Sequence, residues 1–166
     1  MLLTLAPEAV TPRQVAEIVA LGVTVSLGHT NATAAEAEAL LVEGATLFTH
    51  LFNAMSQMEN RAPGVVGAAI NSHAYCSIIA DGLHVDPAML GLSCRARPSP
   101  DHMILITDAM PTVGVSMQDA LRMATRNPAT LMGLEGQISK FIGAEISDLI
   151  VMNDAGSISA LSCAIK

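Results

Sequence analysis

The chain has 166 residues, the length of one domain, and is 51% hydrophobic but only 14% charged. Its net charge is −7 and its Lys and Arg residues are scattered, which excludes nucleic-acid binding through a basic stripe but allows a small anionic substrate. Every apolar run falls short of the ~18 residues of a membrane span, so the apolar excess is better explained by buried parallel strands.

Two composition features bear on the setting of the protein. The three cysteines are odd in number and lack CxxC spacing, and the start lacks a signal-peptide pattern, so we expect reduced thiols in a cytoplasmic protein. Aromatic residues make up only 2%, with no Trp. This scarcity predicts that pieces of the fold are missing from the sequence.

Through about residue 110 the chain alternates apolar segments with amphipathic helical segments. Thr11 and Thr33 each begin a capping box, and Asp86 precedes a proline that opens a further helix. This alternation predicts a parallel sheet, either doubly wound or part of a (β/α)8 barrel. The predicted strands are residues 2–5, 23–27, 46–51, 76–80 and 103–107.

The pattern changes from Ser116 onward. Residues 116–124 predict a capped helix, and Asn127 begins a second, short helix that ends at Gly133. Residues 148–152 (DLIVM) are apolar after Asp148 and predict a further strand.

Polar residues gather where the predicted strands end, which is the active-site face of parallel α/β folds. His29 and His50 follow adjacent strands and suit a divalent metal, because neutral imidazole binds zinc or iron and a bound metal lowers the pKa of water. Asp108 follows the last of these strands and is placed to act as general base. A single His of this kind is more often a core or capping residue; the repetition over four strand ends favours a site.

Other polar residues have weaker claims. Arg61 is a cation in an acidic protein, so phosphate binding and a solvated surface role are both open. His84 could orient a substrate. His73 and His102 precede strands and are predicted to lie at the opposite face.

At these residues the sequence resembles the N-acetylglucosamine-6-phosphate deacetylases, a family of metal-dependent amidohydrolases. The resemblance covers about residues 2–135, and 143–152 resemble the amidohydrolase return strand. The matching motifs are residues 3–8 (LTLAPE), 26–32 (SLGHTNA), 49–55 (THLFNAM), 61–64 (RAPG), 78–86 (IIADGLHVD) and 107–110 (TDAM).

The resemblance implies an α/β fold: a (β/α)8 TIM barrel with strands four to eight in residues 1–135, and a return segment to a small β-sandwich in 136–166. It also implies a divalent metal, zinc or iron with manganese or cobalt as alternatives, and a homodimer in which Arg61 serves the neighbouring subunit. The implied site residues are metal ligands His29 and His50, catalytic Asp108, and substrate-binding Asn53, Ala54, Arg61, Asp81, Gly82, Leu83 and His84.

The sequence departs from the family in two ways. The family's third metal ligand, a Glu in a His-Leu-Glu-Gly-Pro motif on strand three, would precede this chain, and Glu8 belongs to a different motif and is not expected to replace it. A long family segment between the Thr-Asp-Ala motif and the helix at residues 120–125 is also absent. Because five barrel strands alone would leave two unpaired sheet edges, we expect the missing parts in a longer protein or another chain.

The implied function is hydrolysis of the N-acetyl group of N-acetylglucosamine 6-phosphate to glucosamine 6-phosphate and acetate. The alternative is a non-catalytic truncated relic, or a partner subunit, that keeps a phosphosugar-binding rim. An amidohydrolase with another amide substrate is a third interpretation, and the phosphate-binding features argue against it.

Overall fold

In the computed structural model, residues 1–106, 117–134, 151–152 and 158–159 are described. The main body is a parallel sheet with strand order β1-β2-β3-β4-β5. The strands are β1 (Leu2–Leu5), β2 (Thr24–Leu27), β3 (Leu47–Phe48), β4 (Tyr75–Ile78) and β5 (Met103–Leu105). The order follows the chain without the reversal that defines a doubly wound sheet.

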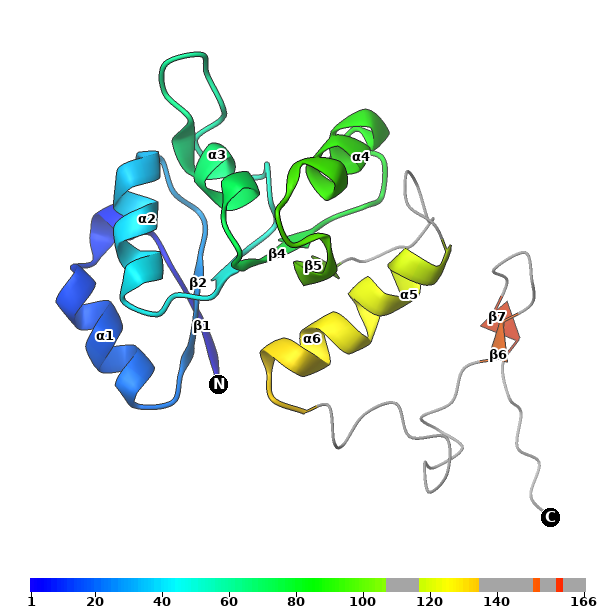
Figure 1. The fold of residues 1–166 in the computed structure, drawn as a ribbon, viewed down its shortest axis with the longest axis horizontal. Coiled ribbons are helices and arrows are strands. Elements are labelled where there is room, and N and C mark those ends of the chain that lie inside the picture. Colours follow the sequence, from blue (N-terminus) through cyan, green and yellow to red (C-terminus); the bar gives the residue numbers. More distant parts are fainter. Residues whose placement is uncertain (107–116, 135–150, 153–157, 160–166) are drawn as a thin grey trace.

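Four helices connect these strands and lie on the same side of the sheet, each contacting the next (Figure 1). They are α1 (Pro12–Ala20), α2 (Ala34–Val42), α3 (Gly64–Asn71) and α4 (Pro87–Ala96), with 3-10 turns η1 (Pro7–Ala9) and η2 (Pro100–His102).

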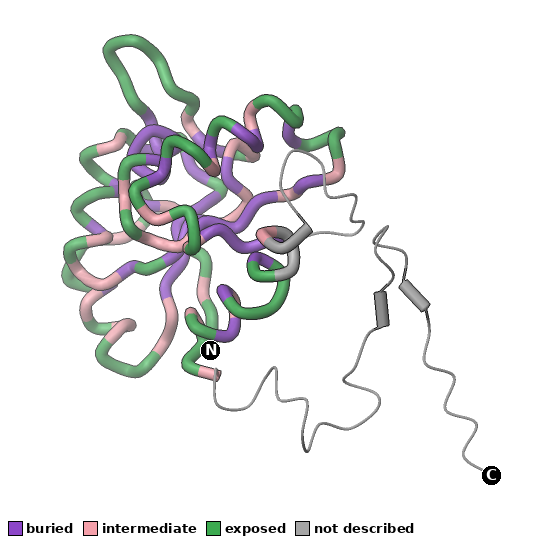
Figure 2. Tube along the Cα trace, turned by 45° about the vertical axis from the view of Figure 1, so that its right-hand side comes forward, coloured by how far each residue is buried: buried purple, intermediate pink, exposed green. Residues whose placement is uncertain are grey.

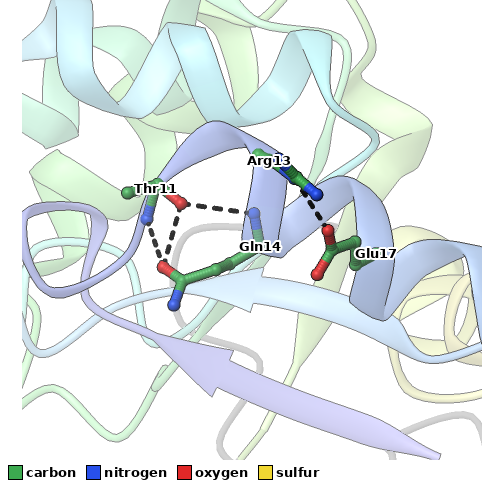
Figure 3. A network of polar contacts seen from close by, with 4 residues as sticks. All are labelled: Thr11, Arg13, Gln14 and Glu17. Carbon is green, nitrogen blue, oxygen red and sulfur yellow. Dashed lines mark hydrogen bonds and ion pairs between the residues drawn. The ribbon is translucent and has the colours of Figure 1, made fainter.

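The helix starts predicted from the sequence are confirmed. Thr11 accepts a hydrogen bond from the Gln14 backbone N–H while the Gln14 side chain accepts from Thr11, and Arg13 pairs with Glu17 on the exposed face (Figure 3). Thr33 and Glu36 form the same capping box at α2. The Asp86 side chain accepts from the Ala88 N–H and caps α4. These caps satisfy donors that a helix leaves unpaired at its N-terminus.

The core lies between the sheet and the helices. Leu27, Phe48, Cys76 and Met103 occupy the same level of adjacent strands and are fully buried. They pack in one cluster with helix residues such as Val65. Figure 2 shows this buried layer along the strands, with exposed residues on the outer surfaces of the helices.

One predicted strand in this region needs correction, and one helix was not predicted. The strand predicted over residues 46–51 is only Leu47–Phe48, because the chain turns at its end and His50 adopts a left-handed backbone conformation with φ of 41°. Helix α3 was not predicted: it is buried along seven of its eight residues and so lacks the polar positions that produce a helical period.

The later segments are described in part. Helix α5 (Met117–Ala124) matches its prediction, although its predicted cap Ser116 lies outside the described residues, and α6 (Arg126–Leu131) begins one residue before Asn127. Of the strand predicted over 148–152, Val151–Met152 forms β6 and pairs antiparallel with β7 (Ile158–Ser159). None of the described helices is both long and apolar enough to span a membrane.

Candidate active site

The carboxyl ends of β2, β3 and β4 bring three of the predicted polar segments to one edge of the sheet. Since these strands are neighbours, His29, His50 and Asp81 follow adjacent strand ends. One residue after β5, the Ile106 N–H donates a hydrogen bond to the Ile78 carbonyl oxygen at 3.1 Å. The pairing of β5 with β4 therefore continues toward this edge. Asp108, the predicted general base, lies outside the described residues.

The two histidines meet at this edge. Their Nε2 atoms are 3.2 Å apart, with ring centroids 4.4 Å apart and ring planes at 83°. Two nitrogen ligands 2.0–2.1 Å from a tetrahedral zinc ion lie about 3.3 Å apart. The pair therefore has the spacing of two imidazoles that share one metal ion.

The described part of the chain places no third candidate metal ligand together with this pair. No group of three or more His, Cys, Asp or Glu side chains that could hold a metal ion occurs among the described residues. The Nδ1 atom of His50 is buried and has no hydrogen-bond partner among the described residues. Metal-bound histidines commonly donate this second N–H to an acceptor, so the pair alone is an incomplete centre.

Small side chains hold His50 in place. The His50 N–H donates to the Ser77 hydroxyl at 2.8 Å, and the Leu51 N–H donates to the Ser77 carbonyl oxygen at 2.7 Å. Gly28 leaves room for Thr49, because a Cβ there would lie 3.0 Å from the Thr49 Cβ. The sheet thereby fixes both neighbours of the left-handed His50.

The predicted phosphate-binding segment lies beside the histidine pair. Ala54 is exposed with φ of 46°, and its carbonyl oxygen accepts from the Thr30 N–H at 2.9 Å. The Asn53 N–H donates to the His50 carbonyl oxygen at 2.9 Å. The structure thus brings together four predicted residues: His29, His50, Asn53 and Ala54.

Glu8 joins this group, although it was not predicted to have a role at the site. Its carboxylate accepts hydrogen bonds from the Thr30 hydroxyl and from the Asn31 N–H. Desolvation raises the pKa of the exposed Glu8 carboxyl, but these hydrogen bonds outweigh it and hold the pKa below its ordinary value. Glu8 also lines an open cavity of about 290 Å³, together with His29, Thr30, Asn31 and Ala54.

Asp81 organises the predicted Asp-Gly-Leu-His segment by itself. Its carboxylate accepts from the His84 N–H at 2.8 Å, from the His84 Nδ1 at 2.6 Å and from the Leu83 N–H at 2.9 Å. These bonds, led by the one from the His84 backbone, lower the pKa of Asp81 to about 2. Gly82 has φ of 76°, which allows the turn, and Leu83 is 89% exposed.

Arg61 is not among the residues that line the cavity beside His29. It belongs to the loop of residues 57–63, which is exposed throughout and projects from the body ahead of α3 (Figures 1 and 2). The structure therefore does not bring Arg61 to the site residues of its own chain.

His73 and His102 lie just before β4 and β5, at the opposite edge from the histidine pair, as predicted. His102 Nδ1 is 2.6 Å from the His73 carbonyl oxygen, and the His102 ring stacks on Tyr75. A cavity of about 410 Å³ lies there, larger than the one beside His29.

Comparisons with known proteins point to one group of enzymes. The chain is 47% identical over 114 residues to the N-acetylgalactosamine-6-phosphate deacetylase of Shewanella sp. (strain ANA-3), covering 68% of the chain and 29% of that relative. It is 30% identical to the human N-acetylglucosamine-6-phosphate deacetylase, covering 96% of the chain and 52% of that relative. No protein-family model matches the chain.

Solved structures agree. The N-acetylglucosamine-6-phosphate deacetylase of Pasteurella multocida superposes with a TM-score of 0.82 at 28% identity, covering 95% of this chain and 53% of that one. A mutant deacetylase of Mycobacterium smegmatis in complex with N-acetyl-D-glucosamine-6-phosphate gives a TM-score of 0.70 at 28% identity, covering 80% of this chain and 49% of that one. The resemblance seen in the sequence is thus confirmed.

The chain spans about half or less of the length of the proteins it matches. The alignment with the human relative runs over 213 positions, more than the 166 residues of the chain. The human relative therefore carries residues that have no counterpart here.

Proposed function

Starting from this similarity to the N-acetylglucosamine-6-phosphate deacetylases, we propose that the chain supplies part of the active site of a metal-dependent deacetylase. The reaction is hydrolysis of the N-acetyl group of N-acetylglucosamine 6-phosphate, which gives glucosamine 6-phosphate and acetate. The observation that carries the proposal is the 3.2 Å contact between the Nε2 atoms of His29 and His50 at adjacent strand ends. A cytoplasmic setting fits, because Cys76 and Cys94 are free thiols.

The proposed architecture is strands four to eight of a (β/α)8 barrel in residues 1–135, with residues 136–166 returning to a small β-sandwich. The strand order without reversal and the helices on the same side support the barrel. In such a barrel, the edge that carries His29 and His50 is the catalytic face.

A divalent metal, zinc or iron, would be held by His29 and His50, and would supply the Lewis acidity that makes water reactive near neutral pH. In the same proposal Asp108 takes a proton from the attacking water. Asp108 then returns the proton to the amide nitrogen, which leaves as the amine. The Asp81–His84 segment lines the sugar-phosphate pocket, where the bonds to Asp81 hold the turn in shape.

The substrate phosphate would be bound by the backbone near Asn53 and Ala54 and by Arg61. Because Arg61 lies on the projecting loop of residues 57–63, the proposal includes a homodimer in which this loop reaches the site of the second subunit. An exposed guanidinium that finds a phosphate in a partner subunit can form two parallel hydrogen bonds to it.

N-acetylgalactosamine 6-phosphate is a second candidate substrate. The relative from Shewanella that is 47% identical to this chain acts on that sugar, by its name. The two sugars differ only in the orientation of one hydroxyl group. Their kcat/KM values, measured side by side, decide between them.

The experiment that tests the proposal removes the two histidines separately. His29→Ala and His50→Ala should each lower the amount of bound divalent metal, measured by elemental analysis, and abolish deacetylation. His73→Ala, which changes a histidine at the opposite edge, is the control and should affect neither. Metal content that stays the same in both site variants would contradict the proposal. Phosphosugar binding without turnover in the metal-loaded protein would instead support the non-catalytic alternative.

A further inference from the structure

Glu8 follows β1 within η1, and its carboxylate reaches the loop that carries His29, which lies more than 20 residues along the chain. We propose that Glu8 is a positioning residue that holds the loop of His29 against the loop of Asn53 and Ala54. The inference rests on the proposed function, in which the first loop serves the metal and the second the substrate phosphate.

The first link joins Glu8 to the His29 loop. The Thr30 hydroxyl donates to one carboxylate oxygen of Glu8, and the Asn31 N–H donates to the other at 3.0 Å. The same hydroxyl oxygen accepts from the Ala32 N–H at 2.9 Å. Because a Thr hydroxyl has one proton, its donation is committed to Glu8. Glu8 thereby fixes the residue next to His29.

The second link joins Thr30 to the loop of Asn53 and Ala54. The Thr30 N–H donates to the Ala54 carbonyl oxygen at 2.9 Å, and the Ser56 N–H donates to the Thr30 carbonyl oxygen at 3.1 Å. Thr30 and Met55 form an isolated parallel bridge. Thr30 is only 5% exposed, so these bonds are shielded from water. Thr30 is therefore the residue that connects Glu8 to both loops.

Both loops need such support. His29 has φ of 51° and Ala54 has φ of 46°, which are left-handed conformations that are unfavourable for a non-glycine residue. Such conformations persist only where the surroundings fix them. Glu8 supplies two charge-assisted bonds at this point, and its side chain forms part of the wall of the cavity that it shares with His29 and Ala54.

The test compares Glu8→Ala, Glu8→Gln and Thr30→Val in the full chain, with Glu38→Gln on the exposed face of α2 as the matched control. Hydrogen exchange measures the exchange rates of the Thr30 and Ser56 amides, and the Ile106 amide between β5 and β4 is the internal reference. Cobalt(II) titration, followed by absorbance, measures the apparent Kd for metal at the His29–His50 pair. Neither measurement requires turnover.

We expect the Glu8 and Thr30 variants to speed exchange at the Thr30 and Ser56 amides at least about tenfold, with Ile106 unchanged. The apparent Kd for cobalt(II) should rise by at least about fivefold, and the combined Glu8→Ala and Thr30→Val variant should be no worse than either single one. Glu38→Gln should change nothing. Unchanged exchange at Thr30 and Ser56, acceleration that includes Ile106, or faster exchange with an unchanged cobalt(II) Kd would each overturn the inference. If the unaltered chain binds no cobalt(II), the exchange data alone decide the role of Glu8, because the histidine pair by itself is an incomplete centre.

Discussion

The side-chain oxygens of Ser26 and Thr49 lie 2.5 Å apart, and the Thr49 hydroxyl is also 3.1 Å from that of Thr4. These three residues come from the ends of adjacent strands, and Thr49 is the residue before His50. Ser26 is fully buried. The hydroxyl contacts therefore connect β1 and β2 to the backbone that presents one of the two histidines.

Thr49→Val keeps the shape of this side chain and removes its hydroxyl. The buried Ser26 hydroxyl then loses its partner, which should lower the free energy of unfolding by about 1–3 kcal/mol. Urea denaturation measures the change. Thr46→Val, an exposed threonine ahead of the same strand, should stay within about 0.5 kcal/mol of the unaltered chain. Equal effects of the two substitutions would mean that the hydroxyl contact contributes nothing.

Much of the fold, and the meeting of the two histidines, could be predicted from the sequence, because both depend on local patterns. The capping boxes at Thr11 and Thr33 mark their helices directly, and histidines after two adjacent strands must share an edge of a parallel sheet. Helix α3 escaped prediction because burial along its length removes any polar period. The contact of Glu8 with Thr30 escaped for another reason: it joins segments whose approach depends on the register of β1 and β2.

Arg97 is another residue whose role the sequence does not reveal. It is 3% exposed and donates to the Ala69 carbonyl oxygen at 2.5 Å, in the last turn of α3, to the Ala74 carbonyl oxygen, and to the Cys76 sulfur at 2.8 Å. The partial negative charge of the helix C-terminus favours a cation at this position. Arg97 therefore ties the end of α4 to the end of α3 and the start of β4.

Arg97→Lys should destabilise the chain by about 2 kcal/mol, because lysine keeps the charge but lacks the planar fork that reaches both carbonyl oxygens. Arg95→Lys, on the exposed surface of the same helix, is the control and should have little effect. Chemical denaturation of the two variants gives the comparison. Similar stabilities for Arg97→Lys and Arg95→Lys would show that the buried fork is not required.

Asp81 predicts a specific dependence of stability on pH. Its pKa is lowered to about 2 from 3.8, so its ionised form stabilises the folded state at pH values above about 4. This contribution should disappear as the pH falls from about 4 to 2. The difference in unfolding midpoint between the unaltered chain and Asp81→Asn should therefore shrink over this window. A difference that stays constant from pH 5 to pH 2 would show that the ionised carboxylate is not the stabilising form.

Arg61 offers the sharpest test of substrate binding across a dimer, because its loop is exposed and its loss should not disturb the fold. Arg61→Ala should raise KM for the phosphorylated sugar by the equivalent of about 1.5–3 kcal/mol, the usual contribution of a hydrogen bond to a charged group. KM for the unphosphorylated sugar should change far less, and the unfolding midpoint should stay the same. Arg13→Ala, which removes an exposed arginine from α1, is the matched control.

A second measurement separates binding in trans from binding within one chain. Arg61→Ala should be mixed with His50→Ala, which lacks a metal ligand, so that subunits exchange. If Arg61 serves the neighbouring subunit, a mixed dimer has one site in which both defects meet and one site with neither defect. At substrate concentrations well below the KM of Arg61→Ala, each mixed dimer should then have about half the activity of an intact dimer. If Arg61 acts within its own chain, each mixed dimer keeps a defect in both sites, and activity at these low concentrations does not rise. Recovery is therefore the result that supports the projecting loop as a link between subunits, and its absence from dimers confirmed by mass would refute that role.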